Sequence, residues 1–270
     1  MSTVTGRIRS IKQPYGGYVR PSSFEKIKFD DGITLNSNED ISPNIIGSAI
    51  DYLTRFLIGV PIETAFQISQ YGYQECIRNY KSLERTLKKR KIDISSLLEQ
   101  IKGTDDASIM AACQACAYDV WYRSPLSAIF SDATYDIPRA CPDIITTENI
   151  RIMLNRCIKF WAQYGPVTIT GFTFENDGYT NVVTDGDGDY LTHDTLWDFK
   201  VSKESKITSK QTLQLLMYWI MGIHSGKEEF KSIDKLGIFN PKLNIVYLLN
   251  TNTISQETIN TVERDVICYK

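Results

Sequence analysis

Histidine is scarce in this chain, which has only His193 and His224 among its 270 residues. Two histidines supply few ligands for a histidine-rich zinc site and few catalytic groups for a histidine-based hydrolase, so neither is favoured. A phosphate-binding loop of the form Gly-X-X-X-X-Gly-Lys-Ser/Thr is also absent, so the chain does not supply an ATP motor of its own. We expect His193 to occupy a hairpin turn, and a helicase, if one acts with this protein, must be a separate subunit.

Long apolar runs are lacking too. The longest strongly apolar segment, "LQLLMYWIMGI", is well short of the roughly 20 residues that a membrane span needs, and "MSTVTGRIRS" lacks the apolar middle of a signal peptide. We therefore expect a cytoplasmic protein without a membrane partner. A hydrophobic content of 42% over this length is enough for one large domain or two closely packed ones.

Closely spaced cysteines are limited to one pair, Cys113 and Cys116, among six cysteines. This pair could begin a zinc or iron-sulfur site, but no second close pair or paired histidines complete a ligand set. The surrounding "SIMAACQACAYDVWY" is typical of a buried helix. We expect reduced, buried thiols and no iron-sulfur cluster.

An excess of positive charge is also missing, because the formal net charge is -2. A nucleic-acid partner must therefore be supported by local basic clusters. There are three: an N-terminal group from Arg7 to Arg20, the run "RTLKKRK" from Arg85 to Lys91, and the group Lys203, Lys206 and Lys210. Each is either a solvated face, which is the commoner case, or a set of phosphate contacts.

Near Val167 the residue pattern of the chain changes from one typical of helices to one typical of strands. Residues 1–40 resemble an irregular arm or short strands. Helical spacing then predicts helices over 42–59, 62–80, 82–101, 105–123 and 147–163. Strands are predicted in "VTITGFTFE", "DYLTHDTLWDFKV" and "NIVYLLN", with a helix in "TSKQTLQLLMYWIMGIHSG". The sequence thus predicts an α/β protein with an arm (1–40) and a main domain (41–270) that carries a helical insertion over about 60–163.

Two acids and a lysine are expected to meet at the predicted hairpin. If Asp189 begins the first strand and Asp198 ends the second, a turn near 192–195 brings the two acids close together. Asp198 and Lys200 are two residues apart, so they point to one face of the strand while Phe199 points to the other. Charges among apolar neighbours destabilise the fold unless they are paired or bind a metal. Carboxylates suit Mg²⁺; the alternative is an exposed ion pair of little consequence.

The same residues carry a resemblance to a known family. Asp189, the tripeptide "DFK" (Asp198 to Lys200) and the helical "QLLMY" (Gln214 to Tyr218) resemble the PD-(D/E)XK nuclease superfamily, specifically its RecB-like members. "GSAID", ending in Asp51, resembles an earlier helix motif that supplies another metal ligand, although Asp51 could equally be a surface residue of an amphipathic helix. "AYDVWYRSP", with Asp119 and Arg123, is more loosely similar to bacterial and phage proteins with this core.

The resemblance implies a restriction-endonuclease-like core, a mixed sheet flanked by helices with a largely helical N-terminal elaboration. It also implies a Mg²⁺- or Mn²⁺-dependent deoxyribonuclease. Asp189, Asp198, the Phe199 carbonyl and Asp51 would hold metal, and Lys200, Gln214 and Tyr218 would complete the catalytic set. Contacts to nucleic acid would come from Lys203, Lys206, Lys210 and Arg123.

Several points stay open at this stage. Asp185 and Asp187 are also possible first acids, and we prefer Asp189 because Tyr190 and Leu191 then enter the strand while Gly186 and Gly188 turn the chain. DNA and RNA are not distinguished. The competing hypothesis is a catalytically inactive protein of the same fold that acts as a binding, inhibitory or interaction module. A complete acid, acid and lysine set argues against that second hypothesis.

Overall fold

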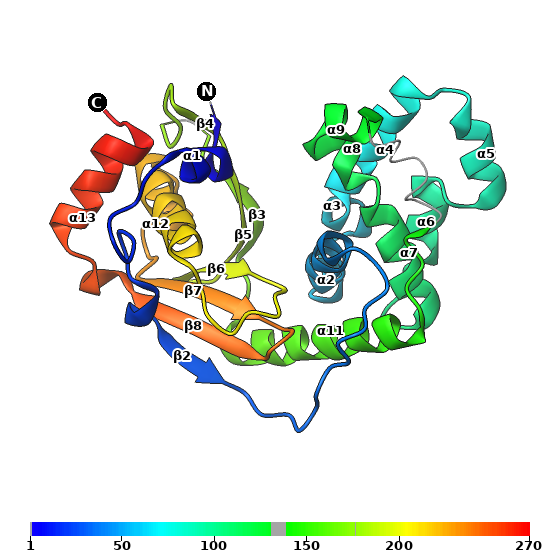
Figure 1. Cartoon of the computed structure of the whole chain (residues 1–270), viewed down its shortest axis with the longest axis horizontal. Helices are drawn as coiled ribbons and strands as arrows, with labels where there is room; N and C mark the ends of the chain where they lie inside the picture. The colour runs from blue at the N-terminus through cyan, green and yellow to red at the C-terminus, as the bar shows by residue number, and fades with distance from the viewer. Residues whose placement is uncertain (1, 131–138, 176) are drawn as a thin grey trace. The chain divides into compact units, whose positions relative to one another are not determined.

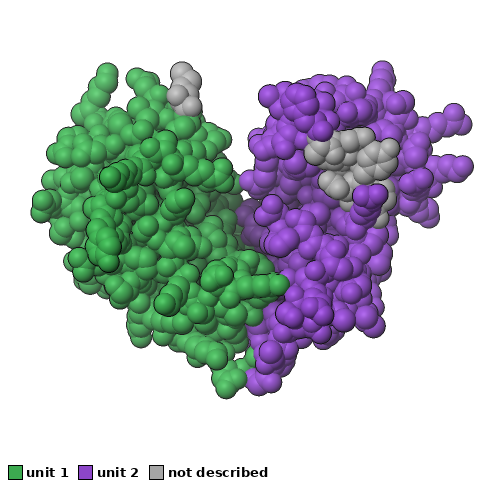
Figure 2. Space-filling view, in the orientation of Figure 1, with its two compact units in different colours: residues 1–31, 160–270 green, residues 32–159 purple. Residues whose placement is uncertain are grey.

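The chain forms two compact units in the computed structural model, which describes residues 2–130, 139–175 and 177–270. Residues 1–31 and 160–270 make up unit 1, and residues 32–159 make up unit 2 (Figure 2). This division differs from the expected one in two respects. Residues 1–31 belong to the unit that holds the sheet, and the predicted helix over 42–59 is grouped with the helices that follow it.

Unit 1 is built on a six-stranded mixed sheet flanked by helices (Figure 1). The strand order is β2-β8-β7-β6-β5-β3, in which only β6 and β7 run parallel to each other. The strands are β2 (Glu25–Lys28), β3 (Ile169–Thr173), β5 (Asp187–Leu191), β6 (Thr195–Phe199), β7 (Lys235–Asn240) and β8 (Ile245–Asn250), and a separate small pair joins β1 (Ser2–Thr3) to β4 (Val183–Asp185).

Helix α12 (Ser209–His224) connects the two parallel strands. Such a pair cannot be joined by a tight turn and needs a crossover of this kind. The helix begins with a capping box between Thr208 and Gln211, and its chain turns away at Gly226, whose φ is +70°. Leu213, Leu216 and Ile220 recur at helical spacing, and all three are buried in the core.

Besides α12 and residues 160–164, unit 1 has further helical segments. They are α1 (Val4–Ser10), α13 (Gln256–Thr261), a π-helical stretch (Val262–Ile267) and short 3-10 turns at Pro21–Ser23, Glu228–Phe230 and Thr251–Thr253. Helix α1 packs on α12 (Figure 1). Arg7 of α1 donates hydrogen bonds to the carbonyls of Val266 and Asp265. The predicted irregular arm is therefore partly helical, because contacts with the far end of the chain order it.

Both faces of β6 are covered, and its side chains alternate between them. Leu196 packs in the core with α12, whereas Trp197 and Phe199 contact Phe160 and Trp161 at the end of α11 (Ile144–Tyr164). All five residues of β6 are buried. This two-sided burial explains the almost continuous apolar character of the strand and makes its one charged residue conspicuous.

Unit 2 is helical, and its predicted helices form in shorter pieces. They are α2 (Pro43–Leu57), α3 (Ile62–Ala65), α4 (Gln67–Asn79), α5 (Leu83–Arg90), α6 (Ile94–Gln100), α7 (Asp106–Cys116), α8 (Asp119–Arg123) and α9 (Pro125–Phe130), followed by most of α11. Buried Asp119 joins three of them, because its carboxylate accepts hydrogen bonds of 2.7 Å from Tyr52 on α2 and Ser69 on α4. Within the described residues, no helix is long and apolar enough to cross a membrane.

Candidate functional site

The hairpin of β5 and β6 brings Asp189 next to the "DFK" tripeptide. Tyr190 pairs with Trp197 and Leu191 with Leu196, so the same register places Asp189 opposite Asp198. There the Asp189 side chain takes part in the strand pairing, because its Oδ2 accepts a 2.8 Å hydrogen bond from the backbone N–H of Phe199. The first acid is thus fixed at the end of β6.

Asp198 and Lys200 lie on the same face and form an ion pair. The Lys200 Nζ is 2.9 Å from each carboxylate oxygen of Asp198. Asp198 is only 3% exposed, whereas the Lys200 side chain is 30% exposed. The lysine therefore links a buried carboxylate to the solvent side of the site.

Nearby carboxylates determine the protonation of Lys200. Burial alone would lower the pKa of this ammonium group, but the negative charges of Asp198, Asp189 and Asp187 outweigh burial and raise the pKa above its ordinary value. Lys200 is therefore a cation at neutral pH. The sequence suggested Asp187 only as an alternative first acid. It lies two residues before Asp189 on the same strand face, so its negative charge also contributes to the raised pKa of Lys200.

Helix α12 presents Gln214 and Tyr218 to the same carboxylates. Gln214 Nε2 donates a 2.8 Å hydrogen bond to the Tyr218 hydroxyl, as two residues one turn apart can do. Burial raises the pKa of Tyr218 well above its usual range, and the charges of Asp198, Asp187 and Asp189 raise it further. The hydroxyl is thus protonated beside the acids. Gln214, which the resemblance places in the catalytic set, thus contacts Tyr218 through its amide.

Gly188 has a different role from the one expected of it. It lies inside β5, and a Cβ at this position would come within 2.0 Å of the Phe172 ring. The glycine therefore makes room for an aromatic ring of the core rather than turning the chain. Gly186, between β4 and β5, lies where a turn was expected.

Two predicted site residues, Asp51 and Arg123, belong to unit 2. Both carboxylate oxygens of Asp51 accept hydrogen bonds from Arg55, at 3.1 and 2.8 Å. Arg123 donates to the Tyr52 hydroxyl at 3.3 Å and lies 3.9 Å from Asp119. Their proposed roles at the acids of unit 1 stay predictions.

The donor set can be compared with the metal that the resemblance implies. Asp189, Asp198 and the Phe199 carbonyl offer oxygen ligands, which fit Mg²⁺ or Mn²⁺ because such ions are commonly held by one or two carboxylates and several waters. In the part of the chain that the structure describes, no three His, Cys, Asp or Glu side chains are grouped closely enough to hold a metal. A zinc site with four protein ligands therefore does not fit. All six cysteines are free thiols, and Cys113 and Cys116 are buried on α7.

A small pocket of about 80 Å³, partly open to solvent, adjoins Lys200. Its polar and charged lining comes from the segment after β6, the start of α12 and the end of β7, while Ile207, Ile238 and Tyr247 supply apolar surface. The polar and charged lining residues are Lys200, Ser202, Glu204, Lys206, Thr208, Gln211 and Asn240. Of the three predicted basic contacts on this segment, Lys206 lines the pocket, whereas Lys203 and Lys210 do not. All three are exposed.

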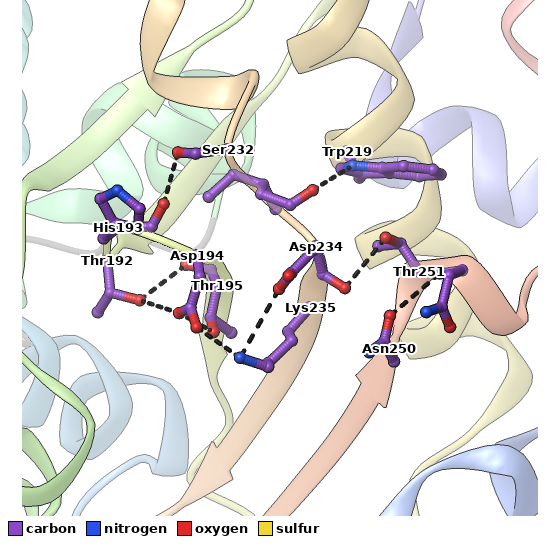
Figure 3. Close-up of polar contacts among 12 residues, drawn as sticks. Thr192, His193, Asp194, Thr195, Trp219, Ser232, Asp234, Lys235, Asn250 and Thr251 are labelled. Carbon is purple, nitrogen blue, oxygen red and sulfur yellow. Dashed lines mark hydrogen bonds and ion pairs between the residues drawn. The ribbon is translucent and has the colours of Figure 1, made fainter.

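At its other end, β6 is anchored by a polar network (Figure 3). The backbone carbonyl of Asp194 accepts hydrogen bonds from the N–H groups of Asp234 and Lys235, at 2.9 and 3.0 Å. The Asp194 carboxylate accepts from Thr195 and Lys235. His193 lies in this turn, as predicted, where its carbonyl accepts from Ser232. The network fixes the hairpin to the start of β7 and thereby fixes the register that carries Asp198.

Comparisons with protein-family models, with curated proteins and with solved structures found no match for this chain. The resemblance to the nuclease superfamily therefore depends on the quoted residues alone.

Proposed function

We propose that this protein is a Mg²⁺- or Mn²⁺-dependent nuclease that hydrolyses DNA phosphodiester bonds on a restriction-endonuclease-like core. The observation that carries the proposal is the buried Asp198, paired with Lys200 and facing Asp189 across the hairpin. A buried ion pair contributes little to stability compared with apolar residues of the same size. A chemical role gives a reason for placing one at the end of a buried strand whose other residues are uncharged.

The site residues have separable roles in this proposal. Asp189, Asp198 and the Phe199 carbonyl would hold the metal, which when bound makes water more acidic and polarises a phosphoryl oxygen. Protonated Lys200 stabilises the negative charge that develops on the phosphoryl group and positions the attacking water. The Tyr218 hydroxyl donates a hydrogen bond to a phosphate oxygen, and Gln214 holds that hydroxyl in place. The pocket beside Lys200 gives the substrate access.

The direct test is cleavage of labelled single- and double-stranded DNA and RNA by the purified protein with Mg²⁺, Mn²⁺ or EDTA. We expect metal-dependent cleavage of DNA that Lys200→Ala and Asp198→Asn each reduce by about 10² to 10³ or more, the loss typical of one electrostatic group. Lys231→Ala is the control, because it removes an exposed lysine of unit 1 that neither lines the pocket nor belongs to the predicted nucleic-acid contacts. A wild-type protein that cleaves none of these substrates, and binds a protein partner equally well with Lys200→Ala, would favour the interaction module.

A further inference from the structure

A dense basic segment occupies residues 78–91 of unit 2. It holds seven lysines and arginines and one acid, Glu84, while the remaining residues of the chain hold eight more acids than bases. The seven basic residues are Arg78, Lys81, Arg85, Lys88, Lys89, Arg90 and Lys91, and all are exposed. The segment therefore carries a net positive charge, whereas the rest of the chain is acidic overall.

Two of these cations have an acidic partner among the residues that the structure describes. Arg78 pairs with Glu75 and Lys88 with Glu84. Within the described residues, the other five form no ion pair with a carboxylate. Repulsion among unpaired like charges destabilises a folded chain, so the arrangement is one that an anionic partner would stabilise.

The segment has a defined shape. Helix α5 is attached to unit 2 by buried Leu87, and its C-cap is Lys91, whose φ is +56°. Arg85 and Lys89 are one turn apart, so their side chains leave the same side of the helix. The helix is about 12 Å long, which corresponds to about three to four base-pair steps of B-DNA.

We propose that the basic segment 78–91 is a nucleic-acid-binding surface that contacts the phosphate backbone without reading sequence. The choice of nucleic acid as the polyanion rests on the proposed function. A membrane surface fits less well, because this segment exposes no large apolar side chain that could enter the lipid. Contacts of this kind release counterions, so they give binding a steep dependence on salt.

The test measures binding apart from cleavage. Fluorescence anisotropy of labelled single- and double-stranded DNA of several sequences, from 50 to 200 mM KCl, is compared in the Lys200→Ala background with and without Arg85→Gln and Lys89→Gln. The matched control is Lys102→Gln with Lys159→Gln, two exposed lysines of unit 2 outside the segment, which remove the same charge. Glutamine keeps the helix propensity, and circular dichroism checks that each variant is folded.

We expect the Arg85→Gln and Lys89→Gln protein to bind all sequences more weakly by a similar factor. Its plot of log affinity against log salt should be shallower by about two, so that its affinity falls about tenfold less than that of the parent over this salt range. The control should keep the slope of the parent. In otherwise wild-type protein, the same pair of changes should raise KM for DNA cleavage without lowering kcat.

The outcomes separate this surface from the nuclease activity. If the wild type cleaves nothing but its DNA binding depends on Arg85 and Lys89, the inference stands without the proposed function. If cleavage is observed while affinity, slope and KM match the control, the inference is overturned and the function stands. A polyglutamate peptide that binds the segment as tightly as DNA would also overturn it, by pointing to an acidic protein partner, and the absence of any DNA binding would overturn both.

Discussion

The carboxylate of Asp189 is hydrogen-bonded to the backbone of Phe199, the residue between Asp198 and Lys200. The Asp189 side chain thus has two roles: it completes the pairing of β5 and β6, and it brings a negative charge to the end of β6. A substitution by asparagine separates these roles, because asparagine keeps an oxygen acceptor and loses the charge.

Asp189→Asn and Asp189→Ala should therefore differ in stability but not in activity. Both should lose metal-dependent cleavage by about 10² or more, because the charge at the metal ligand is gone. Only the alanine variant leaves the Phe199 N–H without its partner, which costs about 1 kcal/mol of unfolding free energy. Urea denaturation and cleavage assays check the two effects. Cleavage at the wild-type rate by Asp189→Asn would show that the charge is not needed.

Metal binding can be measured without activity. A ligand that binds only the folded chain raises its melting temperature, so Mn²⁺ should stabilise the wild type and Lys200→Ala. Asp198→Asn, which removes a charged ligand, should show a much smaller shift. Thermal unfolding with and without Mn²⁺ makes the comparison, and Asp177→Asn, an exposed acid outside the site, is the control. Equal shifts in Asp198→Asn and the wild type would contradict the assignment of Asp198.

Gly188→Ala should destabilise unit 1. The new methyl group would meet the Phe172 ring at 2.0 Å, so the ring or the strand must move, at a cost of about 1 to 3 kcal/mol. At Gly103, by contrast, a Cβ would meet nothing within 4 Å. Gly103→Ala should therefore unfold at nearly the wild-type urea concentration, and an equal loss in the two variants would contradict the packing role.

The geometry of the site was largely accessible from the sequence because its parts are local. Asp198 and Lys200 share a face because strand side chains alternate, and Gln214 meets Tyr218 because helical residues four apart are neighbours. The contribution of Asp187 was not accessible, since it depends on where β5 begins. Tertiary packing, which places Gly188 against Phe172, moved that start two residues earlier than expected.

The parts of the fold that sequence patterns missed depend on distant contacts. Strand β7 begins with Lys235 and contains Gly237, which weaken a strand pattern, yet it is buried between β6 and β8. A Cβ at Gly237 would meet the Trp197 ring at 2.2 Å, so this glycine serves packing across the sheet. Helix α1 likewise depends on the bonds of Arg7 to residues near the other end of the chain. Neither β7 nor α1 can therefore be predicted from the pattern of neighbouring residues alone.

Buried Asp119 should make stability fall as pH rises above about 4. Burial raises its pKa above the ordinary 3.8, despite hydrogen bonds that act in the opposite direction. Between 3.8 and the raised value, the unfolded chain binds fewer protons at this position than the folded chain, so the free energy of unfolding decreases with pH. Each unit of pKa shift corresponds to about 1.4 kcal/mol. Urea denaturation from pH 4 to 7 should show a steeper decrease for the wild type than for Asp119→Asn, and parallel curves would contradict the raised pKa.

The six thiols should differ in reactivity according to their exposure. Cys76, Cys113, Cys116 and Cys157 are buried, and burial raises the pKa of Cys157 to about 12 and of Cys76 to about 11. Cys268 and Cys141 are partly exposed, and Cys141 accepts a hydrogen bond from Gln114. Labelling with a thiol reagent should modify Cys268 first and the four buried thiols only in denaturant, as peptide mass spectrometry can show. Rapid native labelling of Cys113 or Cys116 would contradict their burial in α7.

The discontinuous make-up of unit 1 has a consequence for synthesis on the ribosome. Strand β2 emerges early, but its pairing partner β8, where Leu248 lies opposite Glu25, emerges only after all of unit 2 has been made. Unit 2 is continuous in sequence and can fold as soon as it leaves the exit tunnel. Strand β2 must therefore remain unpaired while unit 2 is synthesised. Its charged residues Glu25, Lys26 and Lys28 disfavour pairing with other nascent chains during that time. The end of β6 is likewise completed late, because the Lys200 N–H donates its hydrogen bond to the Phe239 carbonyl of β7, a strand that is synthesised later.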